Sequence, residues 1–270
     1  SGCGVLSRHA AGTGVVHCDI HDGFYSGVSL GWTWGYLDSV ARDNVVSDCH
    51  IHDIGKGVLN DMGGIYTLGA QPGTVLKGNR IHGIAGRTYG GWGFYPDEGT
   101  RYLLIEKNVV YDCRQGPLNI HYGREIEVRN NIFAGAENGM IHLGAQEPHK
   151  TVFFHSNIVW WKNGLPFNGG RYTEKPYVFR RAVLVPEFTR SDTMDIDYNL
   201  YWNPHGRREA VRFRTEPWEA WVKHGFDSHS AFADPLFADP EHGDFTLAPN
   251  SPVYALGFEP FDFSRVGPRE

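Results

Sequence analysis

A repeat of about thirty residues runs through the first part of the chain and limits what the chain can fold into. Six segments share apolar residues that alternate with Asn, His and small residues: VVHCDIHD (15–22), VVSDCHIHDI (45–54), VLKGNRIHGI (75–84), LIEKNVVYDC (104–113), EVRNNIFAGA (127–136) and VFFHSNIVWW (152–161). The equivalent positions are Cys18, Cys49, Asn79, Asn108, Asn131 and Asn157, with spacings of 31, 30, 29, 23 and 26 residues. Self-similarity at such a period indicates stacked structural units.

Each unit is predicted to consist of short strands. Its two or three runs of alternating hydrophobicity are separated by Gly, Asn or Asp, which is typical of strands and turns. A leucine-rich repeat is disfavoured, because helix-forming stretches and a Leu ladder are absent from the sequence. Equivalent residues of stacked parallel strands lie about 4.8 Å apart, so the Asn side chains of successive units can hydrogen-bond to one another. The predicted fold is therefore all-β: a right-handed parallel β-helix with a C-terminal capping and extended segment.

The chain is expected to have two parts. Residues 1–203 would form the coils of the β-helix, and residues 204–270, where the repeat is lost, would pack on the helix as a cap and extended tail. One short helical stretch is predicted near residues 216–224. A solenoid needs such a cap to protect its last strand. Because the chain starts inside a repeat, we expect a missing N-terminal portion or another chain to cover the first coil.

Charge and composition exclude several classes of partner. The net charge is −6, and residues of both signs are interspersed without a basic stripe, so we expect no nucleic acid partner. No segment is long and apolar enough for a transmembrane helix, so no membrane partner is expected. Four cysteines lack both metal-binding spacing and a dense disulfide pattern. Cys18 and Cys49 occupy equivalent positions and are predicted to stack as free thiols in the core.

The repeat becomes irregular between Asp61 and Tyr122. Three unusual segments occur there: LNDMGGIYTLG (59–69), YGGWGFYPDEG (89–99) and LNIHYG (118–123). The longer spacings lie at the N-terminal end, so those coils carry extra loops, which can form the walls of a groove. Paired carboxylates break glycosidic bonds, one protonating the leaving oxygen and the other attacking the sugar or activating water. Asp61 and Asp97 are the predicted catalytic pair.

A second strand of each coil can also be aligned, and it predicts which side chains face the groove. The aligned segments are GVSLG (27–31), GIYTLG (64–69), GFYPD (93–97), PLNIH (117–121) and GMIHLG (139–144). The residues expected to point inward are Leu30, Leu68, Phe94, Ile120 and Leu143, or their neighbours. Tyr95 and Asp97 then point outward, because strand side chains alternate. The expected outward neighbours are Asn119 and His121 one rung on, and Thr67 and Gly69 one rung back. Asp97 would thus lie directly beside His121.

Six further residues are candidates for binding a sugar substrate: Glu98, His121, Tyr122, Trp92, Tyr66 and Trp32. The aromatic rings can stack on sugar rings, and His121 can orient a carboxylate or bind a hydroxyl group. His21, His52 and His82 recur at one repeat position and are interpreted as a structural ladder, because metal ligands converge on a point whereas a ladder follows an axis. No metal and no cofactor is expected.

The chain resembles glycoside hydrolase family 141. The matching stretches are HDGFYSGVSLGW (21–32), HIHDIGKGVLNDMGGIYTLGAQPGTVLKGNRIH (50–82), YGGWGFYPDEGT (89–100), HYG (121–123) and VRNNIFA (128–134), with a less specific C-terminal likeness over 233–258. The resemblance implies a parallel β-helix acting on plant cell-wall polysaccharide, with α-L-fucosidase or xylanase activity. It also implies functional aspartates at Asp61 in DMGG and Asp97 in DEG. A bacterial extracellular or periplasmic location is expected.

Three functions are carried forward. The first is a glycoside hydrolase whose partner is a polysaccharide or oligosaccharide and whose catalytic residues are Asp61 and Asp97. The second is a polysaccharide lyase on the same fold, which needs a Lys or Arg base and usually Ca²⁺. Lys56 and Lys77 are the only lysines near the irregular segments, and no run of three acids occurs there, which disfavours a lyase. The third is a non-catalytic carbohydrate-binding fragment.

Overall fold

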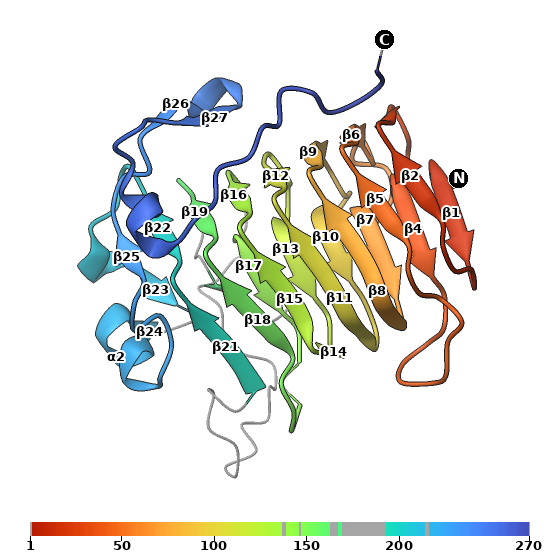
Figure 1. Ribbon diagram of the computed structural model, residues 1–270, viewed down its shortest axis with the longest axis horizontal. Coiled ribbons are helices and arrows are strands. Elements are labelled where there is room, and N and C mark those ends of the chain that lie inside the picture. Colours follow the sequence, from red (N-terminus) through yellow and green to blue (C-terminus); the bar gives the residue numbers. More distant parts are fainter. Residues whose placement is uncertain are drawn as a thin grey trace.

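The computed structural model describes residues 2–136, 139–145, 147–162, 167–168, 193–213 and 216–269. Three parallel sheets run side by side along the molecule, and each coil contributes one strand to each sheet (Figure 1). The structure thus confirms the predicted fold class, an all-β parallel β-helix. Pairing is parallel throughout the three sheets except between the last two strands of the first sheet.

The strands of the three sheets are short. The first sheet consists of β1 (Val5–Arg8), β4 (Val28–Gly31), β7 (Gly63–Leu68), β10 (Trp92–Pro96), β13 (Gly116–Ile120), β17 (Ile141–Leu143), β20 (Phe167–Asn168), β23 (Arg212–Phe213) and β24 (Glu216–Pro217). The second consists of β2 (Gly14–Val16), β5 (Val45–Ser47), β8 (Ala70–Lys77), β11 (Thr100–Glu106), β14 (Gly123–Arg124), β15 (Ile126–Arg129), β18 (Val152–His155) and β21 (Met194–Asp197). The third consists of β3 (Asp19–His21), β6 (His50–Ile54), β9 (Arg80–Ile84), β12 (Val109–Val110), β16 (Ile132–Ala134), β19 (Ile158–Trp160), β22 (Leu200–Trp202) and β25 (Ala231–Phe232).

The predicted column of Asn side chains connects successive coils at the turn between the second and third sheets. Asn108 donates from its backbone N–H and its side-chain amide to Oδ1 of Asn131, at 3.0 and 2.9 Å. Asn131 makes the same pair of bonds to Asn157, both at 3.0 Å. The column is fully buried. A buried backbone N–H needs a partner, and here the next coil supplies it.

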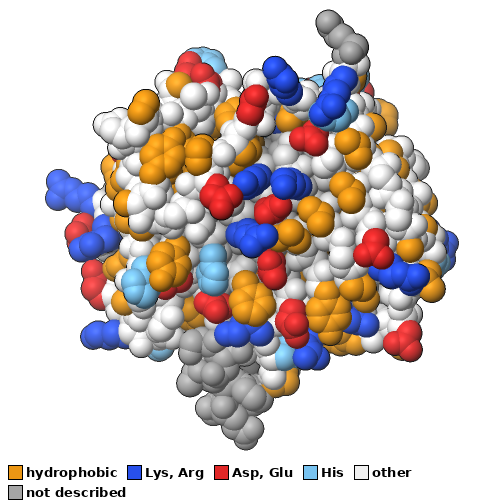
Figure 2. Space-filling view, viewed as in Figure 1, with side chains coloured by type: hydrophobic (Ala, Val, Ile, Leu, Met, Phe, Trp, Pro, Cys, Tyr) orange, Lys and Arg blue, Asp and Glu red, His pale blue; other side chains and the backbone are white. Residues whose placement is uncertain are grey.

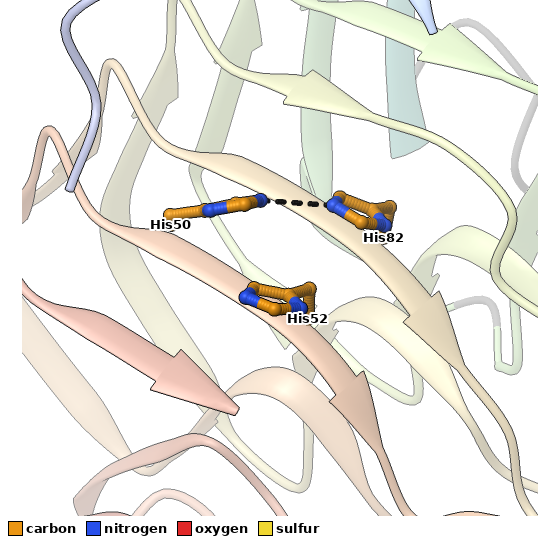
Figure 3. A group of neighbouring side chains, drawn as sticks. All are labelled: His50, His52 and His82. Carbon is orange, nitrogen blue, oxygen red and sulfur yellow. Dashed lines mark hydrogen bonds between the residues drawn. The ribbon is translucent and has the colours of Figure 1, made fainter. Parts of the chain in front are cut away.

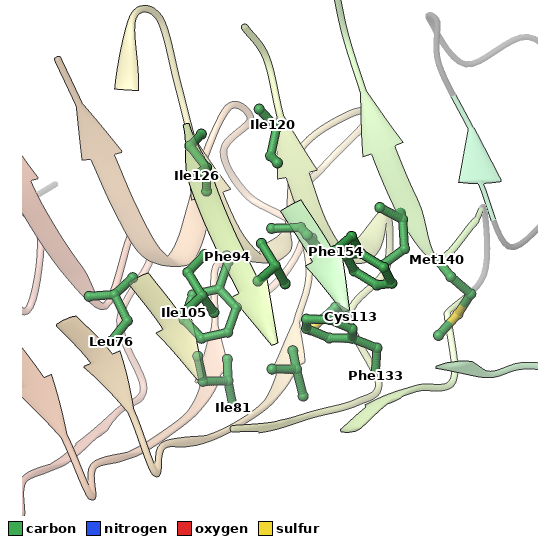
Figure 4. Packing of buried hydrophobic residues seen from close by; sticks show 14 of the residues in the cluster. Leu76, Ile81, Phe94, Ile105, Cys113, Ile120, Ile126, Phe133, Met140 and Phe154 are labelled. Atoms are coloured by element: carbon green, nitrogen blue, oxygen red, sulfur yellow. The ribbon is translucent and has the colours of Figure 1, made fainter. Parts of the chain in front are cut away.

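The core fills the space between the three sheets with aliphatic and aromatic side chains. Figure 4 shows residues of all three sheets pointing into this space, among them Phe94 of the first sheet, Ile105 of the second and Phe133 of the third. All three are completely buried. Cys49 also belongs to this core and Cys18 packs against it, both as free thiols, as the sequence predicted.

Glycine lies against the core near the start of the first-sheet strand in each of the first four coils, at Gly4, Gly27, Gly64 and Gly93. A Cβ on Gly93 would lie 2.2 Å from Cγ1 of Val110, inside the core. A Cβ on Gly64 would lie 2.5 Å from Cγ2 of Ile81. No larger residue fits at these positions without moving the core. The side chains that follow each glycine are thereby fixed in their inward or outward positions.

The register confirms the alignment of the second strands but corrects two expected faces. Val28 pairs with Ile65, and Phe94 pairs with both Ile65 and Leu118, as the alignment requires. The prediction that Thr67 and Gly69 share the outward columns of Tyr95 and Asp97 was wrong. Tyr95 pairs with Tyr66, and Thr67 lies opposite Pro96, buried and bonded to Thr100.

Leu68 is the second correction, because it was expected to point into the core. It belongs instead to a separate apolar cluster with Tyr66, Trp92 and Tyr95, on the other side of the first sheet. A buried residue on the outward face of a sheet cannot be distinguished from a core residue by its hydrophobicity alone. The aromatic rings around Leu68 exclude water from it as completely as the core would.

The C-terminal residues close one end of the coils and then run back along them. Helix α2 (Trp218–Lys223) lies within the stretch where a short helix was predicted. It is accompanied by the 3₁₀ turns η1 (Arg208–Ala210), η2 (Pro240–His242) and η3 (Pro252–Leu256), and by a hairpin of β26 (Phe237–Asp239) and β27 (Asp244–Leu247). The final segment crosses successive coils toward the N-terminus (Figure 1). Its Gly267 donates to the carbonyl of Asp48 at 2.8 Å.

The surface carries charges of both signs. On the face shown in Figure 2, basic and acidic side chains lie next to one another, with scattered apolar and histidine side chains between them. Many are paired, as Glu106 is with Lys77 and Arg129. None of the helices in the described residues has the length and apolar character needed to cross a membrane.

Candidate active site

The candidate site lies on the outward face of the first sheet, where Tyr66 and Tyr95 are neighbours on adjacent rungs. Their ring centroids are 5.2 Å apart and the rings are perpendicular. Trp92 packs against Tyr95 with centroids 4.4 Å apart, and Trp32 lies 5.8 Å from Tyr66. Stacked parallel strands place Tyr66 and Tyr95 side by side, since these two residues are paired on adjacent rungs and project from the same face. The result is an aromatic platform next to both aspartates.

Asp97 follows the end of β10 and is held from two sides. Its Oδ2 accepts a hydrogen bond from the Tyr66 hydroxyl at 2.7 Å, and its Oδ1 lies 2.8 Å from Nδ1 of His121. The side chain is only 8% exposed. The expected juxtaposition of Asp97 and His121 is therefore present. A carboxyl group with a donor at each oxygen is fixed in orientation.

The imidazole of His121 is more accessible than the carboxylate beneath it. Its side chain is 44% exposed. The hydrogen bond to Asp97 raises the pKa of His121 above its ordinary value, against the opposing effect of burial. Asp97 thereby keeps a proton on His121 to higher pH than solvent alone would. The pair presents a positively charged or hydrogen-bond-donating group at the edge of the site.

Asp61 reaches the same platform from the loop between β6 and β7. Its Oδ1 accepts a hydrogen bond from the Tyr95 hydroxyl at 3.0 Å, and its carbonyl accepts one from Tyr25 at 3.0 Å. Its backbone is left-handed, with φ of 61°. Among the described residues, Oδ2 of Asp61 has no hydrogen-bond partner. The two predicted catalytic carboxylates are thus each tied to one member of the Tyr66–Tyr95 pair.

The loop that carries Asp61 is fixed by the corresponding loop of the next coil. Oδ1 of Asn60 accepts hydrogen bonds from the backbone N–H groups of Thr88 and Tyr89, at 2.9 and 3.4 Å. Gly90 allows the close approach, because it has φ of 85° and its Cβ would lie 2.4 Å from the backbone nitrogen of Asp61. The Gly-rich insertions seen in the sequence therefore act in pairs, one loop positioning the other.

The tyrosine hydroxyls beside the aspartates remain protonated. Burial, together with the negative charges of Asp97 and Asp61, raises the pKa of both Tyr66 and Tyr95 far above the usual range. Each hydroxyl is therefore a donor to its carboxylate at all accessible pH values. This arrangement fixes the orientation of the carboxylates without adding a titratable group of its own.

Glu98 and Tyr122 lie at the far side of Asp97. The Tyr122 hydroxyl donates to Oε2 of Glu98 at 3.0 Å, and burial with this hydrogen bond raises the pKa of Tyr122 to about 12. Tyr36, from the long loop between β4 and β5, packs its ring 5.9 Å from that of Tyr122 and donates to Glu147. Tyr36 also lines a neighbouring pocket of about 300 Å³ with Arg101, Tyr102, Arg124 and His149.

The structure brings all eight predicted site residues to one face, but two of them are not open stacking surfaces. Tyr66 and Trp92 are each only 7% exposed, whereas Trp32 and Tyr122 are half-buried. Nε1 of Trp92 is buried and has no partner among the described residues. Such a donor is uncommon in folded proteins. Trp32 and Tyr122 are therefore the rings best placed to meet a ligand.

Sequence reasoning did not include Tyr95, Tyr25 or Tyr36 among the site residues. Tyr95 was expected to face outward but was not named as a site residue. Its position directly before Pro96 and Asp97 is the sequence feature that could have identified it. Tyr36 lies in the GWTWGYL loop (31–37), whose aromatic content and position in the longest repeat spacing mark it as a groove wall. Within the described part of the chain, three potential metal ligands come close together only at His50, His52 and His82, on the third sheet.

Comparison with known families agrees with the architecture. A family model described as a right-handed β-helix region matches residues 1–159, more than half of the chain. Neither the curated proteins nor the solved structures gave a match. The scaffold is compatible with carbohydrate-active enzymes, both hydrolases and lyases.

Proposed function

This chain belongs to the family of right-handed β-helix proteins, and we propose that it is a glycoside hydrolase that uses Asp61 and Asp97. The observation that carries the proposal is the attachment of these two carboxylates to the adjacent tyrosines Tyr95 and Tyr66 on one face of the sheet. Hydrolysis of a glycosidic bond requires two carboxyl groups that flank the bond in fixed orientation. The two phenols supply that fixed orientation.

The hydrogen bonds suggest a division of roles between the two aspartates. Both oxygens of Asp97 meet hydrogen-bond donors that hold the carboxyl group in one orientation, so Asp97 is assigned as the nucleophile or base. The acid role then falls to Asp61, whose Oδ2 is available to the leaving oxygen. His121 and Glu98 would bind sugar hydroxyls beside them. Trp32 and Tyr122 would contact the faces of the sugar rings.

The substrate class proposed is plant cell-wall polysaccharide, with α-L-fucosidase-like or xylanase-like activity, as the resemblance to glycoside hydrolase family 141 implies. An extracellular or periplasmic location would fit such a substrate. A lyase is less well supported, because in the described part of the chain no lysine lies among the hydrogen-bond partners of the two aspartates.

The experiment compares product release by the parent chain, Asp61→Asn and Asp97→Asn on fucosylated pectin and on xylan. The proposal predicts that each substitution lowers kcat by about 10²-fold or more while sugar binding is retained. Glu127→Ala, at an exposed position on the second sheet, serves as the control and should leave activity unchanged. Release that persists in both aspartate variants would contradict the proposal. Binding without turnover by the parent chain would favour a carbohydrate-binding role.

A further inference from the structure

A second cluster of chemical interest lies on the outward face of the third sheet, away from the residues of the candidate active site. His52 and His82 occupy one column on β6 and β9, as the repeat predicted, with parallel rings 5.2 Å apart. His50, two residues before His52, projects from the same face. Its Nε2 lies only 2.9 Å from Nε2 of His82 (Figure 3). His52 and His82 follow the axis of the β-helix, as a structural ladder would. His50 lies beside that ladder, so three imidazole rings meet at one place.

From this convergence we propose that His50, His52 and His82 bind one divalent transition-metal ion, with Zn²⁺ as the ligand. One ring nitrogen of each lies within 4.8 Å of the other two. Nitrogen ligands about 2.0–2.1 Å from a tetrahedral Zn²⁺ are about 3.4 Å apart. The short pair, at 2.9 Å, must open by about half an ångström, and the longest separation must close by at most about 1.4 Å to reach that geometry. These are side-chain movements, not backbone movements.

The imidazole rings can make this adjustment at low energetic cost, because the χ2 torsion of histidine has broad minima. The His82 ring is stacked on Tyr111 with centroids 4.6 Å apart, so His82 stays in place. His52 is the ring that turns, exchanging its contact with Asp19 for the metal. Side chains of His50 and His52 are 27% and 19% exposed, which leaves a path for an ion from solvent.

The electrostatic surroundings favour a cation. Oδ2 of Asp53 lies 2.9 Å from Nδ1 of His52, which leaves Nε2 of His52 for the metal, and Oδ1 of Asp19 lies 3.7 Å from Nδ1 of His50. Carboxylates beside histidine ligands orient the rings and raise their basicity.

The ligand type indicates which class of metal ion the three histidines would bind. Ca²⁺ and Mg²⁺ take oxygen ligands, whereas three imidazoles suit Zn²⁺ and its neighbours in the transition series. Zn²⁺ has no geometric preference from its d electrons, so it tolerates the adjustment that this site requires. Because His50 and His52 come from β6 and His82 from β9, the ion would join two successive coils and stabilise them against unfolding.

The test is calorimetric titration of Zn²⁺ into tag-free, chelator-treated protein, with Co²⁺ absorption as a second readout. One ion per chain is expected, and His82→Ala and His50→Ala should each weaken binding by about tenfold or more. His21→Ala is the matched control, because His21 stacks on His52 at 5.0 Å but is not one of the three, and it should retain parental affinity. Asp19→Asn should weaken binding less than loss of a histidine does.

Two results would overturn the proposal. One is the absence of saturable binding by the parent chain. The other is equal stoichiometry and affinity in the parent chain and in both histidine variants, which would show adventitious binding elsewhere. If His82→Ala does not fold, as judged by circular dichroism, His82→Gln and His52→Ala provide the same comparison. Tetrahedral Co²⁺ absorption in the parent chain that is lost in His50→Ala would support the site.

Discussion

Replacing Asn131 by Ala should destabilise the coils by several kilocalories per mole. The Asn131 side chain is fully buried and takes part in five hydrogen bonds. Its amide donates to the carbonyls of Ile105 and Arg129 and to Asn157, and its Oδ1 accepts from two groups of Asn108. The side chains of Asn108 and Asn157, above and below it in the column, take part in the same number of hydrogen bonds.

The magnitude follows from which partners are left without a bond. The side-chain amide of Asn108 keeps its bonds to Leu76 and Glu106, so its loss is partial. The backbone N–H of Asn108 has Asn131 as its acceptor and would be left buried and unsatisfied, which costs about 1–3 kcal/mol. The other lost bonds contribute about 0.5–1.5 kcal/mol each, partly offset by the bonds that remain. The expected loss is about 3–5 kcal/mol in total.

The assay is chemical unfolding monitored by circular dichroism, with hydrogen exchange at the Asn108 amide as the local readout. Asn131→Ala should lower the free energy of unfolding by the stated amount and should accelerate exchange at Asn108 specifically. Glu127→Ala, exposed in the same coil, should change the unfolding free energy by less than about 0.5 kcal/mol. A loss below about 1 kcal/mol for Asn131→Ala, with exchange at Asn108 unchanged, would refute the reasoning.

Three further predictions concern the site, the C-terminal end and the glycine column. Asp97→Asn should lower the pKa of His121, because the hydrogen bond that raises it is weakened; the imidazole titration followed by NMR checks this, and an unchanged midpoint would contradict it. Burial raises the pKa of Asp227 from 3.8 to about 6, so the folded state binds this proton more tightly than the unfolded state. The free energy of unfolding should therefore fall by about 3 kcal/mol as the pH rises through that window. Asp227→Asn should remove this slope in unfolding curves recorded between pH 3 and 7, and an identical slope would count against the assignment. Gly93→Ala should cost about 1–3 kcal/mol, because its Cβ would overlap a core methyl group, whereas Gly14→Ala, with 3.9 Å of clearance, should cost less; equal midpoints would show that the column is not tightly packed.

The parts of the fold that depend on the repeat could be predicted from the sequence. The period fixed the stacking of coils, and the Asn column followed from the geometry of parallel strands, as Asn108 and Asn131 show. The neighbourhood of Asp97 and His121 was also predictable, because both lie at equivalent positions on adjacent rungs. Their roles in catalysis remain a prediction.

Contacts between loops of different coils could not be predicted in this way. Tyr66 and Trp92 are buried because rings and loops from other coils cover the outward face, which alternation within one strand does not reveal. Thr67 was placed on the wrong face for a related reason: a period of two does not specify which set of residues faces the core. The contact between His50 and His82 depends on the directions of two side chains on neighbouring strands. The sequence shows only that His21, His52 and His82 recur at one repeat position, and His50 is not in that column.

The most direct test of the central claim is mass spectrometry of the products formed in water labelled with heavy oxygen. A hydrolase places one oxygen atom from water on the anomeric carbon of each new reducing end, whichever stereochemistry it follows. The account predicts one labelled oxygen per cleaved bond, after short reaction and reductive quenching, and no labelled product from Asp61→Asn or Asp97→Asn. An unlabelled, unsaturated product would contradict it, and so would labelled product formed equally well by both variants.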